Sequence, residues 1–213
     1  MVPTARWIAG NPCCEFHRTE GGRYRWRMNA DDLDVNLTMD SQVLPESQHR
    51  FYHVVALYLS VAYSGTGKFE FPADLALECE RHHKVVISSL DPDDFAVNLQ
   101  NSIDDMVFDA QRAAKKDPSK AEEKTARARE YQKEASEFID FVSTQSLQPA
   151  ILNPGNPEVH GWAFFKTENN KWIGSWNRRE DFILRVKLKD KVLEFPFSLP
   201  PAEEDFSLRK RDE

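Results

Sequence analysis

The sequence predicts an α+β fold, in which an antiparallel sheet of N- and C-terminal strands is covered by helices and carries a long central helical hairpin. Residues 91–146 place apolar side chains at spacings of three and four, which is typical of amphipathic helices. The flanks on both sides alternate polar and apolar residues, as strands do. We therefore expect one domain over residues 1–201, with the hairpin at 91–146 inserted between β-rich flanks, and a charged tail at 202–213.

The N-terminal flank contains the clearest strand pattern. After a candidate strand at 13–18, the segments 23–28 and 33–40 alternate without error, and a four-residue loop between them predicts a β-hairpin. We predict the register in which the two apolar faces coincide. The predicted pairs are Met28 with Leu33, Trp26 with Val35 and Tyr24 with Leu37 on the apolar face, and Arg27 with Asp34, Arg25 with Asn36 and Arg23 with Thr38 on the polar face.

The segment that follows is predicted to be helical. Residues 45–64 begin with Pro-Glu-Ser and become apolar on nearly every side, which indicates a buried helix. We expect a shorter helix over 72–83 and a strand at 85–87.

Two helix starts organise the central hairpin. Asp-Pro pairs at 91–92 and 117–118 each put a capping carboxylate before a proline at the first helical position. The apolar stripes contain large residues near 95–99 and 138–142, but mostly Ala and Thr in the far half, 115–134. We therefore expect the base of the hairpin to pack on the body and its charged far end to be solvated.

The C-terminal flank is predicted to be a second β unit. Strands are expected at 161–166, 172–176, 182–188 and 192–199, separated by short polar turns. The third of these strands alternates strictly, so one of its faces should lie in the core.

Composition limits the classes of function. The chain has 213 residues, 30% of them charged, and a formal charge of −7, which argues against a dedicated nucleic-acid binder. Residues 1–10 lack the pattern of a signal peptide, and the longest apolar run, 54–63, is about half of a membrane span. Three cysteines without a C-x-x-C pair are typical of a reducing compartment. We expect a soluble cytoplasmic protein without a membrane partner.

Motifs for metal binding and catalysis are incomplete. His49 and His53 share one face of the helix expected at 45–64, but Arg50 stands where a zinc protease has Glu. Adjacent ligands do not preorganise a site, so we predict no metal and no cofactor. A metal-dependent hydrolase that uses His49 and His53 with the His82–His83 region remains an alternative. Its candidate metal ligands are His49, His53, Cys79, His82 and His83.

Without a catalytic motif, we expect an interaction protein, such as an adaptor, an inhibitor or an immunity-type protein whose acidity suits a basic partner. The predicted partner-binding residues are the basic ones at the far end of the hairpin: Lys115, Lys116, Lys120, Lys124 and Arg127. A second alternative is a binder of nucleotides or single-stranded nucleic acid. Its candidate residues are a basic ladder of Arg23, Arg25 and Arg27 with stacking surfaces on Trp172 and Trp176.

Overall fold

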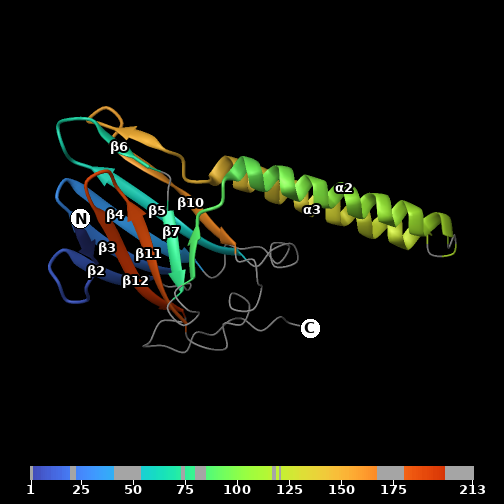
Figure 1. Cartoon of the computed structure of the whole chain (residues 1–213), viewed down its shortest axis with the longest axis horizontal. Helices are drawn as coiled ribbons and strands as arrows, with labels where there is room; N and C mark the ends of the chain where they lie inside the picture. Colours follow the sequence, from blue (N-terminus) through green and yellow to red (C-terminus); the bar gives the residue numbers. More distant parts are fainter. Residues whose placement is uncertain are drawn as a thin grey trace.

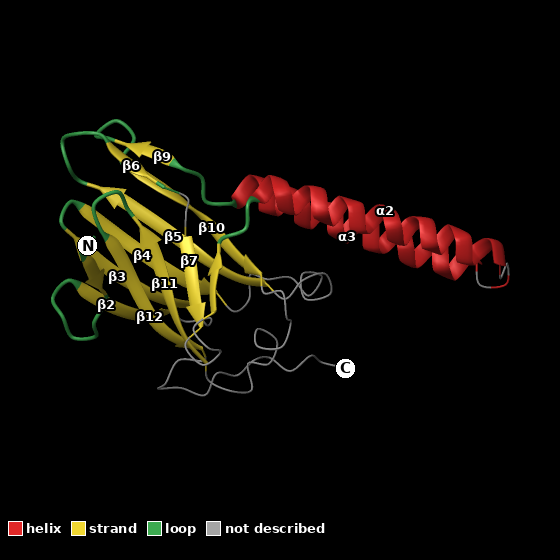
Figure 2. Ribbon diagram, in the orientation of Figure 1, coloured by secondary structure: helices red, strands yellow, loops and turns green. Residues whose placement is uncertain are grey.

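Two helices project from a β-sandwich in the computed structural model (Figures 1 and 2). The structure describes residues 2–19, 23–40, 54–72, 75–79, 85–116, 119, 121–166 and 180–199. Within these residues the strands form two five-stranded sheets and a two-stranded ribbon. The inner faces of the two sheets cover each other, and the helices pack only by their base on the outer face of the first sheet. The predicted α+β fold of a helix-covered antiparallel sheet is therefore wrong.

The first sheet has the strand order β10-β5-β4-β3-β2, with every neighbouring pair antiparallel. Its strands are β2 (Cys14–Thr19), β3 (Arg23–Ala30), β4 (Leu33–Asp40), β5 (Val54–Tyr63) and β10 (Glu158–Lys166). Four of these strands, β2 to β5, follow one another in the element order, whereas β10 joins the sheet after both helices.

The second sheet has the order β1-β12-β11-β7-β8, and its one parallel pair is β1 with β12. Its strands are β1 (Thr4–Arg6), β7 (Leu75–Cys79), β8 (Val85–Ser88), β11 (Glu180–Lys187) and β12 (Val192–Leu199). The ribbon consists of β6 (Phe69–Phe71) and β9 (Ala150–Leu152). The strands expected at 13–18, 85–87, 161–166, 182–188 and 192–199 are confirmed; 172–176 and 202–213 lie outside the described residues.

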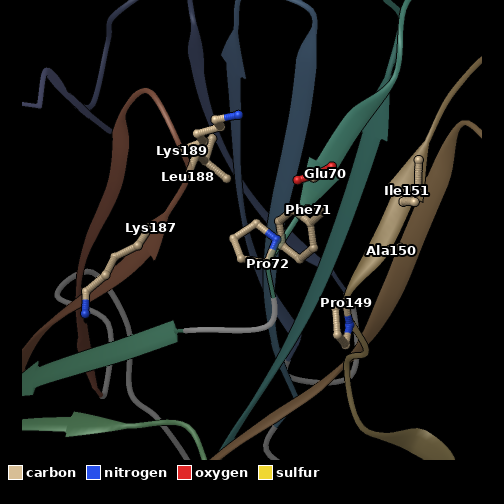
Figure 3. A pocket seen from close by; sticks show the side chains of 9 residues that line it. All are labelled: Glu70, Phe71, Pro72, Pro149, Ala150, Ile151, Lys187, Leu188 and Lys189. Carbon is tan, nitrogen blue, oxygen red and sulfur yellow. The ribbon is translucent and has the colours of Figure 1, made fainter.

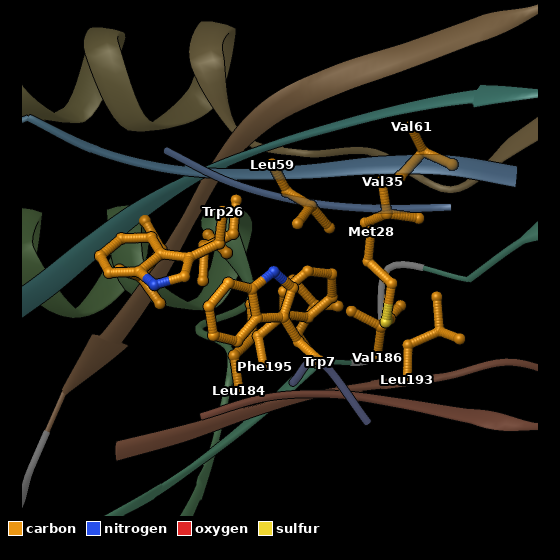
Figure 4. Close-up of a cluster of buried hydrophobic side chains, with 14 of the residues drawn as sticks. Trp7, Trp26, Met28, Val35, Leu59, Val61, Leu184, Val186, Leu193 and Phe195 are labelled. Carbon is orange, nitrogen blue, oxygen red and sulfur yellow. The ribbon is translucent and has the colours of Figure 1, made fainter. Parts of the chain in front are cut away.

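The core lies between the two sheets, where each strand contributes every second side chain (Figure 4). Met28 and Leu59 of the first sheet face Leu184 and Phe195 of the second, and all four are at most 1% exposed. Trp7 enters the same interior, and its indole Nε1 donates a hydrogen bond of 3.1 Å to the carbonyl oxygen of Arg27. Burial of both inner faces therefore provides the main hydrophobic stabilisation.

The register predicted for the β3–β4 hairpin is wrong by two residues. A two-residue turn at Asp31–Asp32, with Asp31 at φ 55°, replaces the expected four-residue loop. A shift of two keeps every side chain on its predicted face, so the alternation alone does not distinguish the two registers. The observed pairs are Met28 with Val35, Trp26 with Leu37, Tyr24 with Met39, Arg27 with Asn36, Arg25 with Thr38 and Arg23 with Asp40.

Two predicted helices are wrong. Residues 54–63 of the expected helix 45–64 form strand β5, and residues 75–79 of the helix expected at 72–83 form β7. Strand β5 lies between β4 and β10 in the first sheet, with its inner face in the core and Ala56 on its outer face covered by the helices. A strand covered on both faces is apolar throughout, which periodicity cannot distinguish from a buried helix.

A charged network lies on the outer face of the second sheet. The Arg185 guanidinium donates from Nε to Glu194 at 2.9 Å and from Nη1 to Glu78, whose side chain is only 9% exposed. Arg6 joins Glu194 at 3.3 Å from a side chain that is 47% exposed. Arg185 thus neutralises the largely buried Glu78 and shares Glu194 with Arg6.

The helices α2 (Pro92–Lys116) and α3 (Ala121–Gln145) occupy the range in which the sequence predicted helices. Asp91 caps α2, because its Oδ1 accepts hydrogen bonds from the amides of Asp93 at 2.9 Å and Asp94 at 3.2 Å. Each helix has 25 residues and is therefore about 37 Å long. We call the pair the arm, and most of its length stands clear of the sandwich (Figure 2). Neither helix has the length and apolar character that a membrane span requires.

Candidate functional site

The arm is attached to the sandwich through strand β10. The amide of Leu90, before α2, donates a hydrogen bond of 2.8 Å to the carbonyl oxygen of Phe164. The amide of Leu147, after α3, donates one of 2.9 Å to the carbonyl oxygen of Trp162. Both ends of the arm are therefore fixed to the same strand, two residues apart.

An apolar cluster secures the base of the arm on the outer face of the first sheet. Phe95 and Phe138 meet edge to face with ring centroids 5.5 Å apart, and Phe141 contacts the Phe164 ring at 6.0 Å. The buried members of this cluster are Ala56, Phe95, Leu99, Ile103, Ala135, Phe138, Val142 and Phe164. Packing and backbone bonds together fix the direction of the arm. The expectation that the base packs on the body is confirmed.

A groove runs along the outer half of the arm, where the two helices meet through small residues. Its volume is about 700 Å³. The groove is lined by Met106, Asp109, Ala110, Ala113, Lys124, Arg127, Ala128, Glu130 and Tyr131. Two predicted partner-binding residues, Lys124 and Arg127, therefore lie on its α3 wall. Lys115 and Lys116 are exposed at the end of α2, away from this lining, and Lys120 lies outside the described residues.

The charges in the groove are available to a ligand. Across the described ranges, Asp109, Lys124, Arg127 and Glu130 make no ion pair or hydrogen bond through their side chains. By contrast, Lys133 on the opposite face of α3 lies 3.8 Å from Glu137, with both side chains more than two-thirds exposed. The groove therefore combines an apolar floor with unpaired cations on one wall.

The arginine ladder of the nucleic-acid alternative is largely engaged within the first sheet. Arg27 donates to Asp34 at 2.8 Å and to Glu15 at 3.3 Å, and the hydrogen bond to Asp34 raises the pKa of its guanidinium. Hydrogen bonds from His17 and Arg27 lower the pKa of Glu15. Arg25 donates to Asn36 at 3.0 Å and is exposed, as is Arg23.

Aromatic side chains that the sequence reasoning missed lie on the same sheet face. Tyr58 of β5 contacts Trp162 edge-on at 5.2 Å and His160 at 6.1 Å between ring centroids. Burial raises the pKa of Tyr58. Alternation along 158–166 would have placed His160 and Trp162 together, but not beside Tyr58. The predicted platforms Trp172 and Trp176 lie outside the described residues.

The proposed metal ligands do not form a site in the described part of the chain. Cys79 is fully buried on the inner face of β7, in the core of the sandwich. No group of three or more His, Cys, Asp or Glu side chains there is arranged to hold a metal ion. The four histidines of the hydrolase alternative, at 49, 53, 82 and 83, fall in segments that the structure does not describe. That alternative stays untested.

A second hollow, of about 580 Å³, opens beside the ribbon β6–β9 (Figure 3). Phe71, Pro72 and Ile151 form its apolar walls, while Glu70 and Lys189 lie at its rim. The polar side chains of this hollow do not converge on one point, so they do not form a catalytic or metal-binding arrangement.

Comparison with known proteins gives no relative: no family model, curated protein or solved structure matches this chain. The groove on the arm is therefore the candidate site on the grounds of its geometry and charge alone.

Proposed function

We propose that the protein is an interaction protein, an adaptor or immunity-type protein, that binds another protein through its arm. The observation that carries this proposal is the groove of about 700 Å³ on a projecting helical pair, where Lys124 and Arg127 have no ion-pair partner among the residues that the structure describes. Such a concave, partly apolar surface with a few placed charges has the character of a binding site.

The attachment of the arm supports the same proposal. Because backbone bonds at Leu90 and Leu147 and the cluster around Phe138 fix the arm, its outer half is held ready before a partner arrives. A preorganised surface loses less conformational entropy on binding, which favours affinity. The exposed charges would steer the encounter and select the partner.

The test compares two double charge reversals on α3. Lys124→Glu with Arg127→Glu changes the groove, and Arg129→Glu with Lys133→Glu makes the same change of charge on the opposite face of the helix. We expect the groove variant to capture at least about tenfold less partner from native lysate, while the control captures as much as the parent protein.

Thermal unfolding should shift by less than a few degrees in both variants, because exposed helix charges contribute little to stability. Equal capture by the two variants contradicts the proposal.

A second candidate function, binding of single-stranded nucleic acid, is favoured by one observation. Arg25 is exposed on the same sheet face as the contacting rings of Tyr58, His160 and Trp162. Stacking of bases on aromatic rings beside arginine is the usual mode of such binding. Titration of tryptophan fluorescence with oligonucleotides at low and moderate salt tests it, with Arg25→Gln as the comparison. A flat response at both salt concentrations rejects it.

A further inference from the structure

We propose that the groove of the arm binds an amphipathic helix of the partner protein as a third helix, with the acidic edge of that helix against α3. This inference rests on the proposed function and specifies its partner. It follows from the length of the groove, the backbone chemistry of its walls and the placement of its charges.

The length of the groove matches two turns of a helix. Along α2 its lining extends from Met106 to Ala113, and along α3 from Tyr131 to Lys124. Seven residues at about 1.5 Å each give roughly 10 Å. A helix bound in a groove uses anchors at positions i, i+3 or i+4, and i+7, which cover the same length. Large side chains at these positions would fill the space that Ala110, Ala113 and Ala128 leave.

The walls of the groove favour a helix over an extended peptide. Both walls lie in the interior of long helices, where the backbone amides and carbonyls bond within the helix. They offer no backbone partner to a strand, whose own amides and carbonyls would be buried without hydrogen bonds. An incoming helix satisfies its backbone internally and needs only side-chain contacts.

The charges orient the incoming helix. Lys124, Arg127 and Glu130 lie on the α3 wall of the groove, which leaves that wall with a net positive charge, whereas Asp109 lies on the α2 wall. Because none of them has a partner within the described residues, an incoming helix makes ion pairs when its Asp or Glu residues face Lys124 and Arg127 and a basic residue faces α2. Rotation of the helix that exchanges the two edges would place like charges together.

A second copy of this chain fits the groove less well. Two identical arms would meet groove to groove, and the alanine floors at Ala110, Ala113 and Ala128 would then face each other across an unfilled space. A single convex helix fills that space. The second copy is therefore an alternative outcome of the test below.

Photo-cross-linking of the full-length protein in native lysate tests the inference. Benzoylphenylalanine replaces Met106 or Tyr131 in the groove, and Arg129 in a matched control on the opposite face. We expect the groove positions to cross-link one segment of a partner, at residues spaced by three, four or seven. Acidic residues should be more frequent at the cross-links from position 131, on the α3 wall, than at those from position 106, on the α2 wall.

The outcomes separate this inference from the proposed function. Cross-links at every second residue of the partner, or scattered over several segments, overturn the helical partner and leave protein binding intact. Cross-links to the arm of another copy of this chain overturn the proposal that the partner is a different protein. Yields at the groove positions that do not exceed the yield at position 129 overturn both proposals.

A pair of alanine substitutions gives an independent check. Ala113→Phe fills the groove, whereas Ala126→Phe adds the same side chain at an exposed position away from it. With benzoylphenylalanine at position 131, we expect Ala113→Phe to lower the cross-linking yield at least tenfold and Ala126→Phe to change it less than twofold. Helical circular dichroism confirms that both variants fold. Equal yields in the two variants overturn the inference.

Discussion

The attachment of the arm makes Gly161 a sensitive position. Gly161 lies in β10 and faces the chain that leaves α3: a Cβ placed on it would be 2.6 Å from both Cα and the amide nitrogen of Leu147. Ordinary contacts of a Cβ begin at 3.4 Å, so the Gly161→Ala substitution requires the backbone of Leu147 to move by about 0.8 Å. Such a movement would break its 2.9 Å hydrogen bond to Trp162.

The magnitude follows from these two effects. Overpacking against backbone costs about 1–3 kcal/mol, and loss of one hydrogen bond about 0.5–1.5 kcal/mol. We therefore expect Gly161→Ala to lower the free energy of unfolding by about 2–4 kcal/mol, measured by urea titration. For a chain of this size the melting temperature should fall by roughly 5–15 °C.

Gly67→Ala is the matched control, because the nearest atom to its Cβ would be the Tyr63 hydroxyl at an ordinary 3.7 Å. It should leave stability unchanged or raise it by up to about 1 kcal/mol, since alanine reduces the entropy of the unfolded chain. If Gly161→Ala unfolds at the same urea concentration as Gly67→Ala, the close approach of β10 to Leu147 is refuted.

Three further predictions concern charge and capping. Arg185→Ala should lower the free energy of unfolding by about 2–4 kcal/mol in urea titrations, because the largely buried Glu78 loses its cation and Glu194 keeps only Arg6. The exposed Arg6→Ala should cost less than about 1 kcal/mol. Hydrogen bonds from His17 and Arg27 lower the pKa of Glu15 in the folded state. The ionised Glu15 carboxylate therefore stabilises the fold above pH 4.5, its ordinary pKa, and this stabilisation is lost as the pH falls through the lowered pKa. Glu15→Gln should therefore weaken the loss of stability on acidification in urea midpoints measured from about pH 6 to about pH 2, and identical pH profiles would contradict this. Asp91→Ala should lower the melting temperature by an amount equivalent to about 1 kcal/mol, because the first amides of α2 lose their cap; an unchanged melting curve would count against the cap.

Local patterns predicted several elements correctly. The cap at Asp91 and the stripe through Phe95, Leu99 and Phe138 place the helices and identify their base. The alternation in β3 and β4 assigns each side chain to its face, although it leaves the register open to a shift of two residues. These features depend on residues that lie within a few positions of one another in the chain, so the sequence alone is enough to predict them.

The candidate site was predictable only in part. Lys124 and Arg127 could be predicted as binding residues because they lie in the basic far end of the predicted helical hairpin. Their position on one wall, opposite Asp109, depends on how α2 and α3 pack. The ring cluster of Tyr58, His160 and Trp162 comes from two strands about 100 residues apart in the chain, and no local signal joins them.

The sequence by itself determined the two helices of the arm, the cap of α2 at Asp91 and the face to which each residue of β3 and β4 belongs. Only the tertiary structure decided that sheet packs on sheet and that the arm projects from the side of β10. The physical reason is that the apolar run of β5 is stable wherever both of its faces are covered. Which surfaces cover it depends on pairings such as β11 with β7 and β1 with β12, which join distant parts of the chain. Burial over the whole chain selects those pairings, and no local pattern contains them.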